Sequence, residues 1–317
     1  MDSQPEVFDY FLPFKLASKI IKALGFWHDE NSSMLYRVYG TVFHLTVIEL
    51  LWILQVVYLF TMADNVKDIS FVLGGLITFT AISSKTLTFM YQLPKIKKLL
   101  QMLEELHHLT QNEQNSEKIK LKYQVTGILK VYKTFLSICV LTALPGLYPL
   151  IFNYHQREIT YKLWIPVDYK HNDFWFFGVA IYLISGPALG ALIEATLDTF
   201  PVMFISFGTG LLEELCQRIN NIVTEIEDIN EQPGPSHNKL TKFQKVVRRE
   251  QMQKKHLKEL LKCIEIHQEI QIFLTNTSEI FSTMIFVQGM CCSINMCTTA
   301  FQLSMVNHTT IKKNYIN

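Results

Sequence analysis

Five stretches of the sequence are apolar over a length that can cross a lipid bilayer as a helix. They cover about residues 41–62, 69–90, 131–152, 174–212 and 270–305. A hydrocarbon core about 30 Å thick needs about 20 apolar residues in helical form. The pattern therefore predicts an all-α, multi-pass transmembrane helical bundle with five spans.

The last two apolar stretches are longer than a single crossing requires. With a helical rise of about 1.5 Å per residue, each would extend more than about 50 Å. We expect each to cross the membrane once and to continue as a helix beyond the cytoplasmic face. For residues 174–212 the alternative is a re-entrant hairpin with Gly186 and Pro187 as its break.

Two polar segments flank these spans and carry their own patterns. In residues 1–40 three lysines alternate with aromatic and aliphatic residues, which predicts an interfacial helix on the cytoplasmic leaflet, ended by Gly25. Residues 213–269 are basic and helical in pattern, and Pro233–Pro235 divide them into two parts. We expect a solvated cytoplasmic helical loop there; contact with anionic lipid or a partner subunit is the alternative. Residues 306–317 form a short tail.

Positive charge alternates from one segment between spans to the next. With the lysines at span ends set aside, alternate segments hold 20 and 6 lysines and arginines. Positive residues stay on the cytoplasmic side, so the N-terminus is predicted to be cytoplasmic. G-protein-coupled receptors have the opposite topology and carry an acidic-Arg-Tyr triplet that this sequence does not contain.

Composition excludes several classes of function. Hydrophobic residues make up 49% and charged residues 18% of the chain, and the net charge of +1 gives no reason to expect nucleic acid as a partner. No phosphate-binding loop, nucleophile elbow or metalloprotease motif occurs. The histidines and cysteines lack metal-ligand spacing, and the six cysteines do not suggest a disulfide framework. The sequence predicts no enzyme, no metal site and no cofactor.

Ionisable residues inside the spans are functional candidates, because they are costly in lipid. Lys85 and Lys133 lie near the cytoplasmic ends of their spans, where we expect them to reach the interface. Glu194 and Asp198 share one helix face, and if that helix leaves the membrane there, they are only cytoplasmic surface or packing residues. Glu49 is near the middle of the first span, and a partner from another helix is expected there.

The outer halves of the second, third and fourth spans mix aromatic and small residues. Small residues permit close helix approach, and beside aromatic rings they can leave an apolar cavity with few polar anchors. Ordinary helix packing is the alternative for any one of them. The candidate ligand-binding residues are Phe71, Gly75, Phe79, Ala143, Gly146, Tyr148, Leu150, Phe177 and Ile181.

Four loose motifs occur in an order and spacing that resemble a known family. They are Leu24–Trp27, Trp164–Asp168, Leu197–Phe200 followed by Leu211–Leu215, and a helix running from His267 through Gln288 to Phe301. Together with the inside N-terminus, they resemble the insect odorant receptors, which have seven transmembrane helices.

The resemblance implies a tuning subunit of a ligand-gated, non-selective cation channel that detects volatile odorants. The partners it implies are membrane lipid and an olfactory co-receptor, in a hetero-tetramer in the cell membrane of sensory-neuron dendrites. The family's sixth and seventh helices have no counterpart after Met305. We therefore expect five of seven spans and no pore, as in a splice variant, a pseudogene product or an incomplete gene model.

Two other functions stay open at this point. A gustatory receptor of the same superfamily would carry its distinguishing motif beyond Met305, so only the internal motifs favour the odorant class. A transporter would show inverted repeats with broken helices, and no such internal symmetry is visible.

Overall fold

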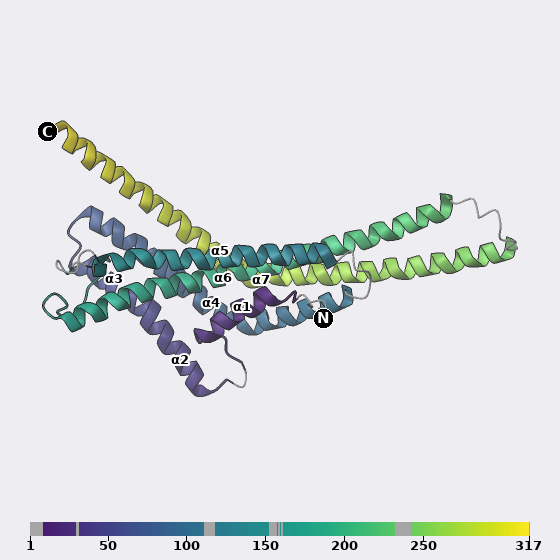
Figure 1. The fold of residues 1–317 in the computed structure, drawn as a ribbon, viewed down its shortest axis with the longest axis horizontal. Helices are drawn as coiled ribbons and strands as arrows, with labels where there is room; N and C mark the ends of the chain where they lie inside the picture. The colour runs from purple at the N-terminus through teal and green to yellow at the C-terminus, as the bar shows by residue number, and fades with distance from the viewer. Residues whose placement is uncertain are drawn as a thin grey trace, which may run out of the picture. The chain divides into compact units, whose positions relative to one another are not determined.

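The computed structural model describes residues 9–29, 32–110, 118–151, 157, 159, 161–231 and 242–316. The side chains of residues 118–120, 140, 142–146, 148–151, 228–231, 242–249 and 306–316 lie outside this description. Within the described ranges every regular element is a helix, which confirms the all-α fold class (Figure 1). The elements are α1 (Leu12–Ala23), α2 (Met34–His44), the π-helical η1 (Leu45–Glu49), α3 (Leu50–Thr61), α4 (Val66–Thr110), α5 (Lys118–Ile151), α6 (Asp173–Glu231) and α7 (Lys242–Ile316).

Four described helical segments are long and apolar enough to cross a membrane. They are Met34–Thr61, Val66–Thr110, Asp173–Glu227 and Glu250–Met305, and each contains or overlaps one predicted span. The remaining predicted span, 131–152, falls within α5 apart from Phe152, which lies outside the described residues. A fifth crossing therefore stays a prediction.

Helix α6 is continuous over 59 residues, so the alternative of a re-entrant hairpin was wrong. Gly186 serves packing and does not break the helix. A Cβ atom on Gly186 would lie 2.6 Å from Leu51 Cδ1, so the missing side chain lets α3 approach α6 closely. Pro187 costs one backbone hydrogen bond, which a long packed helix tolerates.

The long basic segment is helical on both sides of its predicted break. Helix α6 continues to Glu231 and α7 begins at Lys242. Pro233–Pro235 lie outside the described residues. The position of this segment relative to a membrane stays a prediction.

The chain divides into two compact units. Unit 1 comprises residues 1–12, 95–129 and 202–280, and unit 2 comprises residues 13–94, 130–201 and 281–317. In unit 1 the rings of Phe11, His107 and Phe207 pack together, with centroids 5.4–5.9 Å apart. Both units are built from segments distant in the sequence, so neither can form from one contiguous stretch of chain.

An aromatic cluster in unit 2 explains one motif of the sequence. The rings of Trp27 and Phe89, and of Trp27 and Phe200, are 6.4 Å apart, and those of Phe89 and Phe200 are 5.4 Å apart. All three side chains are buried. The apolar-Gly-apolar-Trp motif therefore delivers Trp27 to a core formed with α4 and α6.

Gly25 ends the helix α1, as predicted. Its φ of 82° lies in the left-handed region that glycine adopts without strain. The backbone N–H of Phe26 donates to Ile21 O at 3.0 Å, and that of Gly25 donates to Lys22 O at 3.1 Å. This is the Schellman arrangement, which satisfies the last carbonyls of a helix. The apolar face of α1, including Phe14 and Ile21, is buried; its contact with a membrane leaflet stays a prediction.

Candidate functional site: a cavity and a buried ion cluster

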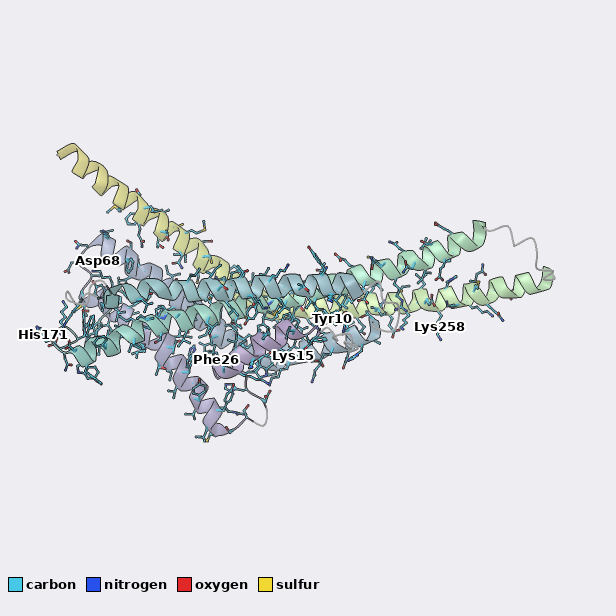
Figure 2. All side chains as sticks on the ribbon, in the orientation of Figure 1. Tyr10, Lys15, Phe26, Asp68, His171 and Lys258 are labelled. Atoms are coloured by element: carbon cyan, nitrogen blue, oxygen red, sulfur yellow. The ribbon has the colours of Figure 1, made fainter. Side chains whose placement is uncertain are left out.

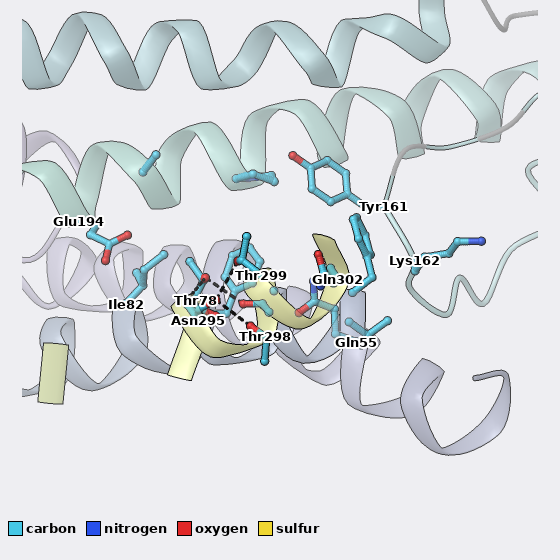
Figure 3. A pocket seen from close by; sticks show the side chains of 17 residues that line it. Gln55, Thr78, Ile82, Tyr161, Lys162, Glu194, Asn295, Thr298, Thr299 and Gln302 are labelled. Carbon is cyan, nitrogen blue, oxygen red and sulfur yellow. Dashed lines mark hydrogen bonds between the residues drawn. The ribbon is translucent and has the colours of Figure 1, made fainter. Parts of the chain in front are cut away.

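A cavity of about 440 Å³ lies within unit 2. It is formed by α3, α4, α6, α7 and the loop before α6 (Figure 3). Its volume is within the range of about 300–1,000 Å³ that is usual for small-molecule sites. The lining residues are Gln55, Phe71, Val72, Gly74, Gly75, Thr78, Phe79, Ile82, Tyr161, Lys162, Pro187, Ala191, Glu194, Asn295, Thr298, Thr299 and Gln302.

The structure brings three of the nine predicted ligand-binding residues to this wall. They are Phe71, Gly75 and Phe79, all on α4. Phe177 and Ile181 lie on α6 as exposed side chains and do not line the cavity. The other four, Ala143, Gly146, Tyr148 and Leu150, are in α5, and their side chains lie outside the described residues. A role in ligand binding stays a prediction for all nine.

Most of the polar wall comes from residues that the sequence reasoning missed. Thr298, Thr299 and Gln302 lie three, four and seven residues after Asn295 on α7. Positions at that spacing share one face of a helix. A polar stripe on an otherwise apolar span was the signal that could have identified them, because such residues are expensive in lipid.

Hydrogen bonds from α7 attach this stripe to α4. Asn295 Nδ2 donates to Thr78 Oγ1 at 3.0 Å, and the Thr78 hydroxyl donates to Gly74 O at 3.0 Å. Gln302 Nε2 donates to Ser70 O at 2.9 Å. Figure 3 shows the Thr78–Asn295 group on the side of the cavity formed by α4 and α7. The cavity wall is therefore held by specific bonds between two helices.

The loop before α6 is joined to the first span beside the cavity. The backbone N–H of Trp164 donates to Leu54 O at 3.1 Å, next to Gln55. Tyr161 in the same loop lines the cavity, and burial raises the pKa of its phenol, so it remains protonated. These contacts place Trp164, the first residue of the Trp164–Asp168 motif, next to α3 near the cavity.

The start of α6 is organised by a short turn. His171 Nδ1 lies 2.9 Å from Asp168 Oδ2 and 3.0 Å from Oδ1, on the exposed side of the loop labelled in Figure 2. The hydrogen bond from His171 lowers the pKa of the Asp168 carboxyl below its ordinary value of 3.8. Asp168 is thus ionised under physiological conditions and accepts hydrogen bonds in the turn.

A buried ion cluster adjoins the cavity, and it bears on two predictions. Lys85 is only 1% exposed, and its Nζ lies 3.1 Å from Glu194 Oε1 and 2.6 Å from Asp198 Oδ1. The prediction that Lys85 reaches the interface was therefore wrong, and Glu194 and Asp198 have a role beyond surface or packing, because both pair with its ammonium. Their four-residue spacing directs both carboxylates from α6 toward α4. Lys133, by contrast, is exposed.

Helix α7 also contributes to the ion cluster. Gln288 Nε2 donates to Glu194 Oε1 at 3.3 Å. Glu194 also lines the cavity, so its carboxylate belongs both to the ion cluster and to the cavity wall. A substitution of Glu194 would consequently remove its contacts with Lys85 on α4 and Gln288 on α7 and would change the cavity wall.

Glu49 has a partner from another helix, as the sequence analysis expected. Ser83 Oγ on α4 donates to Glu49 Oε1 at 2.5 Å, and His44 Nε2 lies 3.1 Å from the same oxygen. Glu49 is the last residue of the π-helical turn η1. A π turn inserts one residue into an α-helix and often occurs at functional positions. Ser83 gave no signal of its own in the sequence.

Comparison with known proteins decides the family. The family model described as "7tm Odorant receptor" matches residues 65–316. The chain belongs to the insect odorant receptor family. Its members are multi-pass membrane receptors and not enzymes, so the prediction that this odorant receptor is not an enzyme is confirmed. The match also favours the odorant class over the gustatory and transporter alternatives.

Individual relatives of this odorant receptor are distant. It is 22% identical to Odorant receptor Or1 of Anopheles gambiae over 301 residues, which is 91% of this chain and 69% of that receptor. It is 21% identical to Odorant receptor 2a of Drosophila melanogaster, covering 87% of this chain and 66% of that receptor. The solved insect olfactory receptor OR5 from Machilis hrabei shares the fold, with a TM-score of 0.62, 13% identity and coverage of 93% and 72%.

Proposed function

We propose that this chain binds volatile odorants in the cavity of unit 2 and acts as the tuning subunit of a ligand-gated, non-selective cation channel. The single observation that carries the ligand-binding role is the cavity itself. Its wall is mainly apolar, with Phe71, Gly75 and Phe79 on α4, and a few polar groups are held in place on α7. Small-molecule sites combine these two features.

The partner in this proposal is the olfactory co-receptor, in a hetero-tetramer in the cell membrane of a sensory-neuron dendrite. Large side chains such as Phe60, Phe286 and Met296 are 84%, 69% and 74% exposed in the single chain. Because the chain belongs to a family of membrane receptors, these exposed apolar side chains support contacts with lipid and with other subunits. The charge bias of the sequence supports a cytoplasmic N-terminus.

Current recording from cells that express this chain with the co-receptor tests the ligand-binding role. Phe79→Ala enlarges the cavity and should change the rank order of odorants in a panel of volatile esters, ketones and alcohols. Phe135→Ala is the matched control, because Phe135 is exposed on α5, does not line the cavity and is not among the predicted ligand-binding residues. Equal effects of the two variants on the odorant profile, or no odorant response and no odorant binding at all, would contradict the proposal.

The topology and the partner have separate tests. A protease-sensitive tag at the N-terminus should be cut only after the cell membrane is permeabilised, and a tag cut on intact cells would reverse the predicted orientation. Photobleaching steps of this chain, labelled in complexes with the co-receptor, should number fewer than four. A count of four would mean a homo-tetramer.

A further inference from the structure

Two buried oxygen atoms of the cavity wall accept no hydrogen bond from any residue that the structure describes. One is Gln55 Oε1, on a side chain that is only 5% exposed, and the other is Asn295 Oδ1. Both residues line the cavity. Gln55 comes from α3 and Asn295 from α7, so the two amides reach the same cavity from different helices. A buried acceptor without a donor is costly, and a bound molecule that supplies the donor removes that cost.

The orientation of the Asn295 amide follows from its neighbours. The Thr78 hydroxyl has one proton, which it donates to Gly74 O. Toward Asn295 it can therefore only accept, and the atom at 3.0 Å must be Nδ2. This places the carbonyl oxygen of Asn295 on the other side, where it acts purely as an acceptor.

The remaining hydroxyl groups of the α7 stripe use their protons within the wall. Thr298 and Thr299 both donate to the backbone oxygen of Asn295, at 2.9 and 2.8 Å. Each can then only accept a hydrogen bond from a ligand. Glu194, also in the lining, is an acceptor when ionised. The hydroxyl groups of the inner wall therefore act only as acceptors toward a ligand, and the donors of this wall are the amide N–H groups of Gln55, Asn295 and Gln302.

Two glycines of α4 leave space beside the orphaned amides. A Cβ atom on Gly74 would lie 3.9 Å from Asn295 Oδ1, and one on Gly75 would lie 2.7 Å from Gln55 Nε2. The phenol of Tyr161 and the ammonium of Lys162 are further donors in the lining, and both residues belong to the loop. Lys162 is exposed, and Figure 3 shows its ammonium pointing away from the Thr78–Asn295 group.

We propose that this cavity is selective for volatile ligands that carry a hydroxyl group, with Gln55 and Asn295 as the acceptors that read it. An alcohol or phenol supplies the donor that the two buried amide oxygens lack, while its apolar part contacts Phe71, Phe79 and Ile82. A ketone, aldehyde or ester of equal size brings only acceptors and leaves both amide oxygens unpaired. This inference rests on the proposed role of the cavity as the ligand site.

A displacement assay on the full chain in lipid nanodiscs tests this selectivity without requiring channel current. The fluorescent probe N-phenyl-1-naphthylamine is loaded first and then displaced with three eight-carbon compounds, 1-octanol, 2-octanone and octane. One hydrogen bond gained in an apolar site corresponds to about a ten-fold change in affinity. We expect 1-octanol to displace the probe at about one tenth of the 2-octanone concentration.

Substitutions then locate the acceptors. Gln55→Met keeps the length of the side chain and removes the oxygen, and Asn295→Leu does the same on α7. Each should reduce the preference for 1-octanol over 2-octanone to about two-fold or less. Gln101→Met is the control, because Gln101 is exposed on α4 and does not line the cavity. It should leave the ratio unchanged.

The outcomes separate this inference from the proposed function. Equal displacement of the probe by all three compounds from the unmodified chain overturns hydroxyl selectivity and leaves the cavity as a ligand site. A preference for 1-octanol that survives both substitutions overturns the assignment of the acceptors. Failure of every compound to displace the probe contradicts the proposed function itself. The comparison on the unmodified chain decides the main point even if a variant does not fold.

Discussion

At the scale of single residues, the buried ammonium of Lys85 is the feature with the largest energetic consequence. It neutralises one of two carboxylates on α6, and burial of charges is tolerated only when they are paired. Lys85→Met would leave Glu194 and Asp198 facing each other without a cation. We expect a loss of about 2–3 kcal/mol in the free energy of unfolding, seen as a lower thermal unfolding midpoint in detergent.

A matched lysine provides the control for this substitution. Lys133→Met removes an exposed lysine from α5 and should leave the unfolding midpoint nearly unchanged. Adding Glu194→Gln and Asp198→Asn to Lys85→Met should restore most of the lost stability, since no unpaired charge then remains. If Lys85→Met and Lys133→Met have equal effects, the ion cluster does not stabilise the fold.

The turn before α6 should respond to acid because its pKa is shifted downward. Asp168 has a lower pKa in the folded chain than in an unfolded one, so its contribution is present at neutral pH. That contribution is lost only as the pH falls through the lowered pKa, below about 3.8. Fluorescence of Trp164, read against a Trp164→Phe background, should change in that range, and Asp168→Asn should abolish the change. A transition near pH 6 would contradict this assignment.

The ion cluster of Lys85, Glu194 and Asp198 could be predicted from the sequence only in part. It identified Lys85, Glu194 and Asp198 as charged positions within spans, but it assigned each one alone from its depth. The ion cluster depends on contacts over 109 and 113 positions in the chain, which depth cannot reveal. For Glu49 a partner from another helix was expected but not named, because a serine such as Ser83 is too common in helices to be selected in advance.

At the scale of elements, the contact between Gly25 and Gly40 controls how α1 joins α2. A Cβ atom on Gly40 would lie 2.1 Å from Gly25 O, and one on Gly25 would lie 2.5 Å from Gly40 Cα. Both clashes involve backbone atoms, which cannot rotate away. We expect Gly40→Ala to destabilise the fold by about 1–3 kcal/mol, measured by thermal unfolding.

An opposite effect is expected at a glycine with open surroundings. Gly127 in α5 has no neighbouring atom within 4 Å of an added Cβ, so Gly127→Ala should stabilise the helix by up to about 1 kcal/mol. The two alanine variants thus differ in sign. Similar behaviour of both would show that α1 and α2 do not cross at these glycines.

The close approach of α3 and α4 should affect ligand selectivity through Gly75. An alanine at this position would come within 2.7 Å of Gln55 Nε2 and displace the amide. We expect Gly75→Ala to reduce the preference for 1-octanol over 2-octanone about as much as Gln55→Met does. Gly178→Ala in α6, which meets no atom within 4 Å, should leave the preference intact. A normal preference in Gly75→Ala would place the hydroxyl elsewhere in the cavity.

Helical periodicity predicted the elements better than it predicted their ends. Four of the five predicted spans contain or overlap helices that are long and apolar enough to cross a membrane. The boundaries differ because polar residues continue the same helix beyond the apolar stretch, as in α4, which runs on to Thr110. Gly186 and Pro187 suggested a break because local propensity was read without the neighbour, Leu51, that the glycine accommodates.

At the scale of the whole molecule, the long helices leave many large apolar side chains exposed, as in a protein that is surrounded by lipid. Only 17–33% of the most apolar part of each long helix is buried within the chain. Alkaline carbonate extraction should therefore leave the chain in the membrane fraction, whereas a peripherally bound protein would be released. Recovery in the soluble fraction would contradict an integral membrane location.

The π turn at Leu45–Glu49 makes the relative rotation of α2 and α3 sensitive to the gain or loss of a single residue. On the N-terminal side of the turn, Gly40 packs against Gly25. On the C-terminal side, Leu54 O accepts a hydrogen bond from Trp164 N. Loss of a residue within the turn would rotate one side against the other by about 100°. Either the contact between Gly25 and Gly40 or the position of Gln55 in the cavity wall would then be lost. An insertion or deletion within this turn would therefore change the shape of the cavity although every wall residue keeps its identity.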